Sequence, residues 1–306
     1  MDKIFIIVNP VSANHNTGKE WPEFEKVLQG SDYKFDTVFT EYPGHGSELA
    51  GQALRMGYKT IMSVGGDGTM NEVINGFYKD GRSIDADSRL VIFSRGTGCD
   101  FIKTLGINKG IESLLAVLAR NEEKQLDVGC VNFVDNTGNT TKRYFLNVAD
   151  IGMGAETANK VNKHSKLLKG FFSFMLGAVS TIMLYKNKDF EVVIDDEIYL
   201  NERLNSVIVA NGKYFGGGMK IAPDAMADDG VFDIIILGNL SKPEIIRSFP
   251  LIYKGEHMSH PKVRHYRGKK VNIKSCGLGL IEVDGEIPGR YDAVFEIMPK
   301  TIKVLV

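Results

Sequence analysis

Two glycine-rich turns constrain the fold of this chain most strongly, because each separates a strand-like run from a helical pattern. The first turn is Gly65-Gly66-Asp67-Gly68-Thr69, which follows residues 60–62 and precedes apolar residues at helical spacing. The second is Gly96-Thr97-Gly98-Cys99-Asp100, which follows the apolar run 90–93. Strand-turn-helix units that lie about thirty residues apart predict neighbouring crossover units of one parallel sheet.

The chemistry of these turns favours a nucleotide-phosphate site. Glycines at a strand-to-helix turn let backbone N–H groups approach an anion, and the N-terminus of the next helix favours negative charge. Asp67 would repel a bare phosphate, so its place in the turn indicates a divalent cation or a ribose hydroxyl nearby. For either turn alone, the alternative is a tight turn that is merely rich in glycine.

The pattern of elements predicts two domains. Strands alternate with helices over residues 1–125, which predicts an α/β domain with a parallel sheet, to which residues 299–306 are expected to return. Short strand-like runs between turn residues dominate residues 126–298 and predict an antiparallel β-rich domain. This second domain carries a predicted helical insertion near 156–186. We expect the active site in the cleft between the domains, where parallel sheets bind ligands at their carboxyl edge.

Composition excludes some classes of partner. The formal net charge of −1 over 306 residues makes nucleic acid an unexpected partner. The three cysteines, Cys99, Cys130 and Cys276, lack metal-ligand spacing and are typical of a reducing compartment. The apolar run at the N-terminus is too short for a signal peptide, so a cytoplasmic location is expected.

Two further segments leave alternatives open. The apolar stretch 170–185 is shorter than the roughly 20 residues that cross a bilayer. It predicts either a core-facing helix with solvated ends or a helix that lines a lipid entrance. The basic stretch 262–270 is either a solvated surface or a site of attraction to anionic membrane.

Other phosphate-binding and catalytic motifs are missing from the sequence. No G-x-x-x-x-G-K-[ST] pattern occurs, and the dinucleotide fingerprint fails at Asn71, where it requires a third glycine. The protein-kinase motifs and the nucleophile elbow do not occur either.

The motifs that do occur are those of a known family. They are Asn9-Pro10, Gly65-Gly66-Asp67-Gly68-Thr69-x-Asn71-Glu72, Gly96-Thr97-Gly98-x-Asp100-Phe101, a run of Lys220 to Asp233, and Asp284-Gly285-Glu286. In this order they resemble the diacylglycerol kinase catalytic-domain family of lipid kinases, particularly its bacterial two-domain members with an NAD kinase-like fold. The first glycine turn alone is shared with NAD kinases, whereas the combination is much more specific.

The resemblance implies binding of ATP and Mg²⁺ and transfer of phosphate to a lipid hydroxyl. It implies a catalytic role for Glu286 as general base. From the chemistry of the ion, which takes few carboxylates and keeps its waters, Asp67 and Asp100 are expected to hold the catalytic Mg²⁺, directly or through water. Nucleotide contacts are implied for Asn9, Thr40, Gly65, Gly66, Asp67, Gly68, Thr69, Met70, Asn71, Gly96, Thr97 and Gly98. A structural Mg²⁺ is implied at the backbone carbonyls of Met226 and Val231 and the carboxylate of Asp229.

The chain departs from the family pattern at two motifs. Residues 11–14 are Val-Ser-Ala-Asn, where the family usually has Ser-Gly after Asn-Pro-x. Ser94-Arg95 precedes the second glycine turn where proline is usual, and Cys99 replaces asparagine. These departures affect the shape of the phosphate site and the substrate rather than the fold.

Taken without the resemblance, the late acidic motif 284–286 has two interpretations. A lipid hydroxyl needs a base, and Glu286 follows an apolar strand in a turn with Asp284, where partial burial would raise its pKa. The alternative is a solvated hairpin turn. For the loop 226–231, the alternative to a structural cation site is an exposed acidic turn.

Three functions therefore stay open at the level of sequence. The first is an ATP-dependent lipid kinase that acts at the inner face of the membrane as a peripheral protein, with a homodimer allowed. The second is an NAD kinase-like phosphotransferase with a soluble acceptor, and the third is a nucleotide-binding regulatory module. The late acidic motif and the apolar stretch 170–185 favour a lipid acceptor, and the retention of Asp67, Asp100 and Glu286 disfavours simple binding. The sequence does not identify the lipid.

Overall fold

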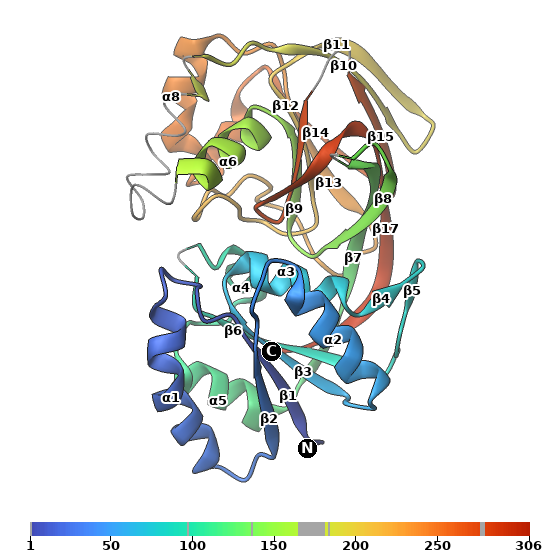
Figure 1. Cartoon of the computed structure of the whole chain (residues 1–306). Coiled ribbons are helices and arrows are strands. Elements are labelled where there is room, and N and C mark those ends of the chain that lie inside the picture. Colours follow the sequence, from blue (N-terminus) through green and yellow to red (C-terminus); the bar gives the residue numbers. More distant parts are fainter. Residues whose placement is uncertain (1, 97, 136, 165–180, 183, 276–278) are drawn as a thin grey trace. The chain divides into compact units, whose positions relative to one another are not determined.

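The structure is a computed structural model that describes residues 2–96, 98–135, 137–164, 181–182, 184–275 and 279–306 (Figure 1). Thr97, Cys276 and most of the stretch 170–185, for which the sequence predicts a helix, lie outside the described residues. The chain divides into two compact units, one of residues 1–128 and 299–306 and the other of residues 129–298. Among the described residues, no helix is both long enough and apolar enough to span a bilayer.

The first unit is built on a parallel sheet. Its strands follow the order β6-β3-β1-β2, and every neighbouring pair is parallel, as the alternation of strands and helices predicts. Lys303 and Val304 of the last strand pair in parallel with β6. The strands are β1 (Ile4–Val8), β2 (Phe35–Phe39), β3 (Thr60–Gly65) and β6 (Arg89–Ser94), with a small hairpin of β4 (Tyr78–Lys79) and β5 (Arg82–Ser83).

The core of this unit is formed by apolar side chains that alternate along its strands. Ile4, Ile6 and Val8 lie on one face of β1 and share a buried cluster with Trp21 and Leu118, so helices α1 and α5 cover that face. Helices α2 and α3 pack against each other and against β1 and β3. The helices are α1 (Asn16–Gln29), α2 (His45–Arg55), α3 (Asp67–Asn75), α4 (Asp100–Leu105) and α5 (Ile111–Arg120).

The second unit is antiparallel and rich in β structure. One run of strands has the order β14-β13-β12-β9-β16-β17, while β15 joins β17 to β10, and β10 pairs with β11. Its strands are β8 (Thr140–Phe145), β9 (Val148–Gly152), β10 (Lys188–Ile194), β11 (Ile198–Leu204), β12 (Ser206–Ala210), β13 (Phe232–Leu237), β14 (Val263–Gly268), β15 (Lys270–Ser275) and β16 (Leu280–Val283). Strands β7 (Glu123–Asp135) and β17 (Glu286–Leu305) contain residues of both units.

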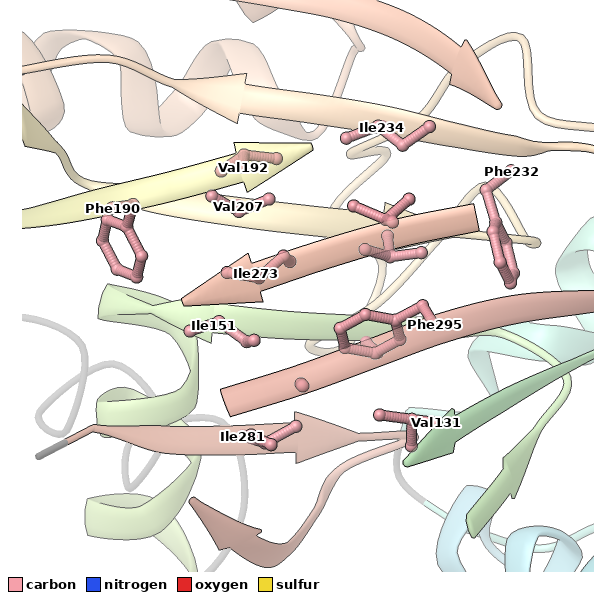
Figure 2. Close-up of a cluster of buried hydrophobic side chains, with 14 of the residues drawn as sticks. Val131, Ile151, Phe190, Val192, Val207, Phe232, Ile234, Ile273, Ile281 and Phe295 are labelled. Carbon is pink, nitrogen blue, oxygen red and sulfur yellow. The ribbon is translucent and has the colours of Figure 1, made fainter. Parts of the chain in front are cut away.

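Aromatic and branched side chains fill the core of the second unit (Figure 2). Phe190, Phe232 and Phe295 are fully buried, and the ring of Phe232 stacks on that of Phe145 at 5.7 Å between centroids. In the described part of this unit, the helical segments include α6 (Met153–His164), α8 (Lys242–Ile252) and a 3₁₀ turn (Glu256–Ser259). The predicted fold class, a parallel α/β domain followed by an antiparallel β-rich domain, is confirmed.

Candidate functional site

The two glycine turns lie side by side at the carboxyl edge of the parallel sheet. Strands β3 and β6 are neighbours, and the backbone N–H groups of Arg95 and Gly96 donate to the carbonyl of Gly65 at 2.6 and 3.3 Å. A Cβ atom on Gly96 would lie 2.6 Å from the Cα atom of Gly66. The turns therefore approach so closely that the side chain of any other residue at position 96 would collide with backbone.

Asp67 links the two turns through its carboxylate. The backbone N–H of Asp100 donates to both carboxylate oxygens of Asp67 at 3.1 and 3.2 Å, and Phe101 N–H donates to one of them at 3.5 Å. Asp67 thus caps the start of α4 from a distant part of the sequence. Burial, reinforced by the Asp100 carboxylate, raises the pKa of Asp67, while the backbone donors of α4 oppose this shift.

The carboxylates of Asp67 and Asp100 converge on Gly98. A Cβ atom on Gly98 would lie 3.2 Å from Oδ2 of Asp67 and 3.4 Å from Oδ2 of Asp100. Asp100 is almost fully buried, and Lys103 Nζ donates to its Oδ1 at 2.8 Å. Two partly desolvated carboxylates beside a glycine suit Mg²⁺, which takes one or two carboxylates and keeps several waters.

Polar residues at the ends of neighbouring strands adjoin the first turn. Asn9 follows β1, and its Nδ2 donates to Oγ1 of Thr69 at 2.9 Å. The backbone N–H of Asn9 donates to Val64, and that of Thr40 donates to Val8, both at 2.9 Å. Asn9, Thr40 and Thr69 are thus brought to the same edge of the sheet as the glycine turns.

Other residues of the first motif support the turn from inside. Met70 and Asn71 are 2% and 0% exposed as whole residues, so they pack beneath the turn and present almost no surface of their own. Glu72 has a role that the motif alone did not indicate. Its carboxylate accepts the backbone N–H groups of Gly44 and Gly46 at 2.8 and 3.1 Å and thereby caps α2.

The residues that differ from the family pattern make contacts within the first unit. Arg95 forms an ion pair with Glu20, and its guanidinium lies 4.6 Å from the centroid of the Phe24 ring, so it fastens α1 to the second turn. Cys99 has a left-handed backbone, with φ of 51°, which asparagine adopts more readily than most residues. Its thiol donates to the carbonyl of Gly96 at 2.8 Å, and burial raises the pKa of the thiol.

In the second unit, Asp284 and Gly285 form the two-residue hairpin between β16 and β17. Both have positive φ, 48° and 90°, which is the conformation that an Asp-Gly pair favours in such hairpins. The Asp284 carboxylate accepts the backbone N–H groups of Leu146, Asn147 and Val148, each at 3.1 Å. Asp284 is therefore a buried anchor, and the alternative of a fully solvated turn is wrong for it.

Glu286 is the first residue of β17 and pairs in register with Val283. Its side chain is exposed, so the expected partial burial of Glu286 is wrong. The two-residue hairpin turns the chain before Glu286, and a second buried acid, Glu282, lies within β16. Glu282 lies directly opposite Asp150 of β9, and both are buried. The sequence signal for this pair is weak, because it consists only of an acid within each of two apolar strands.

The loop 226–231 contains a carboxylate that already has partners. Asp229 accepts the backbone N–H of Val231 at 3.3 Å and forms an ion pair with Arg267. The Asp229 side chain is only 13% exposed, whereas Met226 is exposed. Among the described residues, no three acidic, histidine or cysteine side chains gather as metal ligands, so a cation here would depend on backbone carbonyls. It would also compete with Arg267 for the carboxylate.

Comparisons with known proteins agree with this architecture. Residues 3–131 match the diacylglycerol kinase catalytic domain, and residues 147–306 match the YegS C-terminal NAD kinase beta sandwich-like domain. Diacylglycerol kinases of Staphylococcus haemolyticus and Staphylococcus aureus are each 28% identical over 299 residues, which is 98% of this chain and 86% and 90% of theirs.

Solved structures share the fold. A diacylglycerol kinase from Bacillus anthracis superposes with a TM-score of 0.72 at 18% identity, covering 99% of this chain and 96% of that one. Another structure from the same bacterium, with the same coverage, gives a TM-score of 0.76 at 21% identity.

The two domains and the paired glycine turns define a phosphotransferase. More particularly, the chain belongs to the diacylglycerol kinase family of lipid kinases and combines its catalytic domain with the NAD kinase-like β-sandwich domain. The resemblance that the motifs indicated is confirmed.

Proposed function

We propose that this protein transfers the γ-phosphate of ATP to the hydroxyl of diacylglycerol or a related lipid, with Mg²⁺ bound at Asp67 and Asp100. The observation that carries the proposal is the convergence of these two carboxylates on Gly98 between two abutting glycine turns. The family and the names of the staphylococcal relatives support a lipid acceptor over a soluble nucleotide.

In this proposal, the first unit binds and orients the nucleotide. Backbone N–H groups at the start of α3, in the turn 65–69, face phosphate oxygens, and Asn9 and Thr40 bound the site at the ends of β1 and β2. A Mg²⁺ ion at the carboxylates would neutralise charge on the phosphates, which is the main requirement of phosphoryl transfer. Lys103 holds the Asp100 carboxylate in place.

Glu286 supplies the general base in this proposal. The acceptor hydroxyl becomes a better nucleophile as it gives its proton to a carboxylate within hydrogen-bond reach. The hairpin 284–285 fixes the backbone before Glu286, and three backbone donors fasten that hairpin to residues 146–148. A base on a rigid strand end, exposed to an incoming lipid, suits this role.

A structural cation at the loop 226–231 remains part of the proposal. The carboxylate of Asp229 and the carbonyls of Met226 and Val231 are hard oxygen donors of the kind that Mg²⁺ takes. Arg267 already neutralises this carboxylate, so the site would form at the expense of the ion pair.

Peripheral contact with the inner face of the membrane follows from the proposed substrate rather than from the basic stretch 262–270. Most of the cations in that stretch pair with acids, which removes much of their attraction for anionic lipid. The pairs are Lys262 with Glu244, Arg264 with Glu202, His265 with Asp233, Arg267 with Asp229 and Lys270 with Glu296.

The proposal is tested by incubating the full chain with radiolabelled ATP, MgCl₂ and detergent micelles that contain one lipid each. The panel is diacylglycerol, a sphingoid base, undecaprenol and phosphatidylglycerol, with NAD as a soluble acceptor. We expect label in diacylglycerol or another lipid and none in NAD. Label in NAD alone, or ATP binding without any acceptor, would overturn the proposal in favour of a nucleotide kinase or a regulatory module.

A further inference from the structure

Two acidic residues face each other inside the second unit, and neither has a basic partner among the described residues. Asp150 of β9 is the direct cross-strand partner of Glu282 of β16. The two residues are 1% and 5% exposed. Directly opposed residues on antiparallel strands have Cβ atoms about 4.5–5.5 Å apart, so the two carboxyl groups share one desolvated space.

Within the described part of the chain, each carboxyl group has one oxygen with hydrogen-bond partners and one without. Asp150 accepts the backbone N–H groups of Gly154 and Ala155, at the start of α6, and a hydrogen bond from the side chain of Ser206. Glu282 Oε1 accepts the backbone N–H of Gly285 in the hairpin. Oδ1 of Asp150 and Oε2 of Glu282 are buried and have no hydrogen-bond partner within the described ranges of the chain.

The charges around the pair are acidic. The charged groups that act on Glu282 are Asp150, Asp284 and Glu286, all of which disfavour its ionised form. On α6, which packs against β9 and β16, Glu156 is paired with Lys188 of β10. No described residue on this face therefore neutralises two buried anions, and two carboxylates this close do not both ionise readily.

One shared proton would remove one of the two buried negative charges and supply a donor for the two oxygens without partners. A protonated carboxyl gains an O–H donor, and an ionised carboxyl keeps an acceptor. The number of orphaned oxygens, one on each residue, matches a single O–H···O bond between them. The pair would then carry one negative charge, held by the backbone donors of α6.

We propose that Asp150 and Glu282 share one proton and that the resulting pair positions the hairpin that presents Glu286. Glu282 reaches the hairpin through its bond from Gly285, the residue that immediately precedes Glu286. Glu282 is thus a positioning residue, and this part of the inference rests on the proposed role of Glu286.

The shared proton makes the stability of the fold depend on pH. Burial raises the pKa of Asp150 to about 7, and burial together with the Asp150 carboxylate raises the pKa of Glu282 well above its ordinary value. The folded chain then keeps a proton that the unfolded chain releases above about pH 4. This contribution to stability is full below about pH 4 and is lost as the pH rises, by about tenfold in the unfolding equilibrium per pH unit, until the raised pKa of Glu282 is reached.

Glu282→Gln removes the shared proton while keeping the shape of the side chain. The glutamine amide donates to Asp150 and its carbonyl still accepts from Gly285, so the variant should fold. It should lose the tenfold-per-unit pH dependence of unfolding above about pH 7, where the Asp150 carboxyl is itself ionised. In infrared spectra at neutral pH, the wild type should show the C=O band of a buried protonated carboxyl that Glu282→Gln lacks. Glu296→Gln, which removes an exposed carboxylate from the same unit, should keep both properties.

Three outcomes would overturn the shared proton. They are a wild type without the carboxylic-acid band, a Glu282→Gln variant with an unchanged pH dependence, and a melting temperature that EDTA lowers in the wild type but not in Glu282→Gln. The last result would mean that a cation joins the two carboxylates.

The positioning role has its own readout. Glu282→Ala should lower kcat of lipid phosphorylation at least tenfold with little change in the Kd for ATP, and Glu282→Gln should restore kcat. Equal kcat for all three proteins would reject positioning, while the spectra would still decide the shared proton. A wild type without any kinase activity would instead overturn the proposed function and the positioning role together.

Discussion

At the scale of single residues, Asp67 has two roles. Its carboxylate accepts backbone N–H groups at the start of α4, and it converges with Asp100 on Gly98. Any oxygen acceptor can cap α4, whereas binding of Mg²⁺ requires negative charge. Substitutions at Asp67 therefore separate the structural role from the proposed chemical role.

Asp67→Asn should abolish most phosphate transfer and leave folding intact. The asparagine oxygen still accepts from Asp100 N–H, but the charge that binds Mg²⁺ is gone. Turnover is measured with the lipid acceptor, and folding by circular dichroism and melting temperature. Asp67→Ala is the control, because it also removes the cap of α4 and should cost about 1 kcal/mol of stability. Turnover near the wild-type level in Asp67→Asn would remove Asp67 from the metal site.

At the scale of elements, close backbone approach fixes the two turns, and side-chain caps fix the helices beside them. Gly96 abuts Gly66, and the distant carboxylates of Asp67 and Glu72 cap α4 and α2. These contacts join segments that are far apart in sequence. Local pattern predicts the strand, the turn and the helix, but not which carboxylate caps which helix.

Gly96→Ala should destabilise the first unit by about 1–3 kcal/mol, because the added methyl group meets the backbone of Gly66 and neither can move freely. Gly30→Ala is the matched control: Gly30 has φ of −73°, and the nearest atom to its added Cβ lies at 3.5 Å. The free energy of unfolding of both variants is measured in urea. Equal stability of the two variants would show that the turns do not abut.

The loop 226–231 gives a second prediction at this scale. If it holds a structural cation, EDTA should lower the melting temperature of the wild type, and Asp229→Ala should lower it without EDTA. Because Asp229→Ala also breaks the ion pair with Arg267, the control is Arg267→Gln, which frees the carboxylate and should enlarge the shift caused by EDTA. A melting temperature that EDTA changes in neither the wild type nor Arg267→Gln would exclude the cation.

At the scale of the whole molecule, the sequence predicts the fold class but only part of the candidate site. Alternating elements predict the parallel sheet of the first unit, and the glycine turns predict which of its edges carries the polar residues. The second unit is harder, because its acidic contacts depend on antiparallel register between distant strands. Asp284 meets residues 146–148, and Glu282 meets Asp150, through pairings that no local period reveals.

The exposure of Glu286 is another feature that the local sequence pattern does not predict. The apolar strand before it predicts a buried end, but the two-residue hairpin buries Asp284 and Glu282 and leaves Glu286 accessible. Register and turn type, rather than hydrophobicity, decide which of three neighbouring acids is available for chemistry.

The turnover of Glu286→Gln, measured beside its affinity for ATP, tests the central claim most directly. Glutamine keeps the size and hydrogen bonding of the side chain but does not accept a proton at neutral pH. We predict that kcat for lipid phosphorylation falls by about 10²-fold or more, as for the loss of a general base, while the Kd for ATP changes little. Wild-type turnover in Glu286→Gln would contradict the account, and loss of ATP binding together with turnover would make Glu286 a binding or structural residue instead.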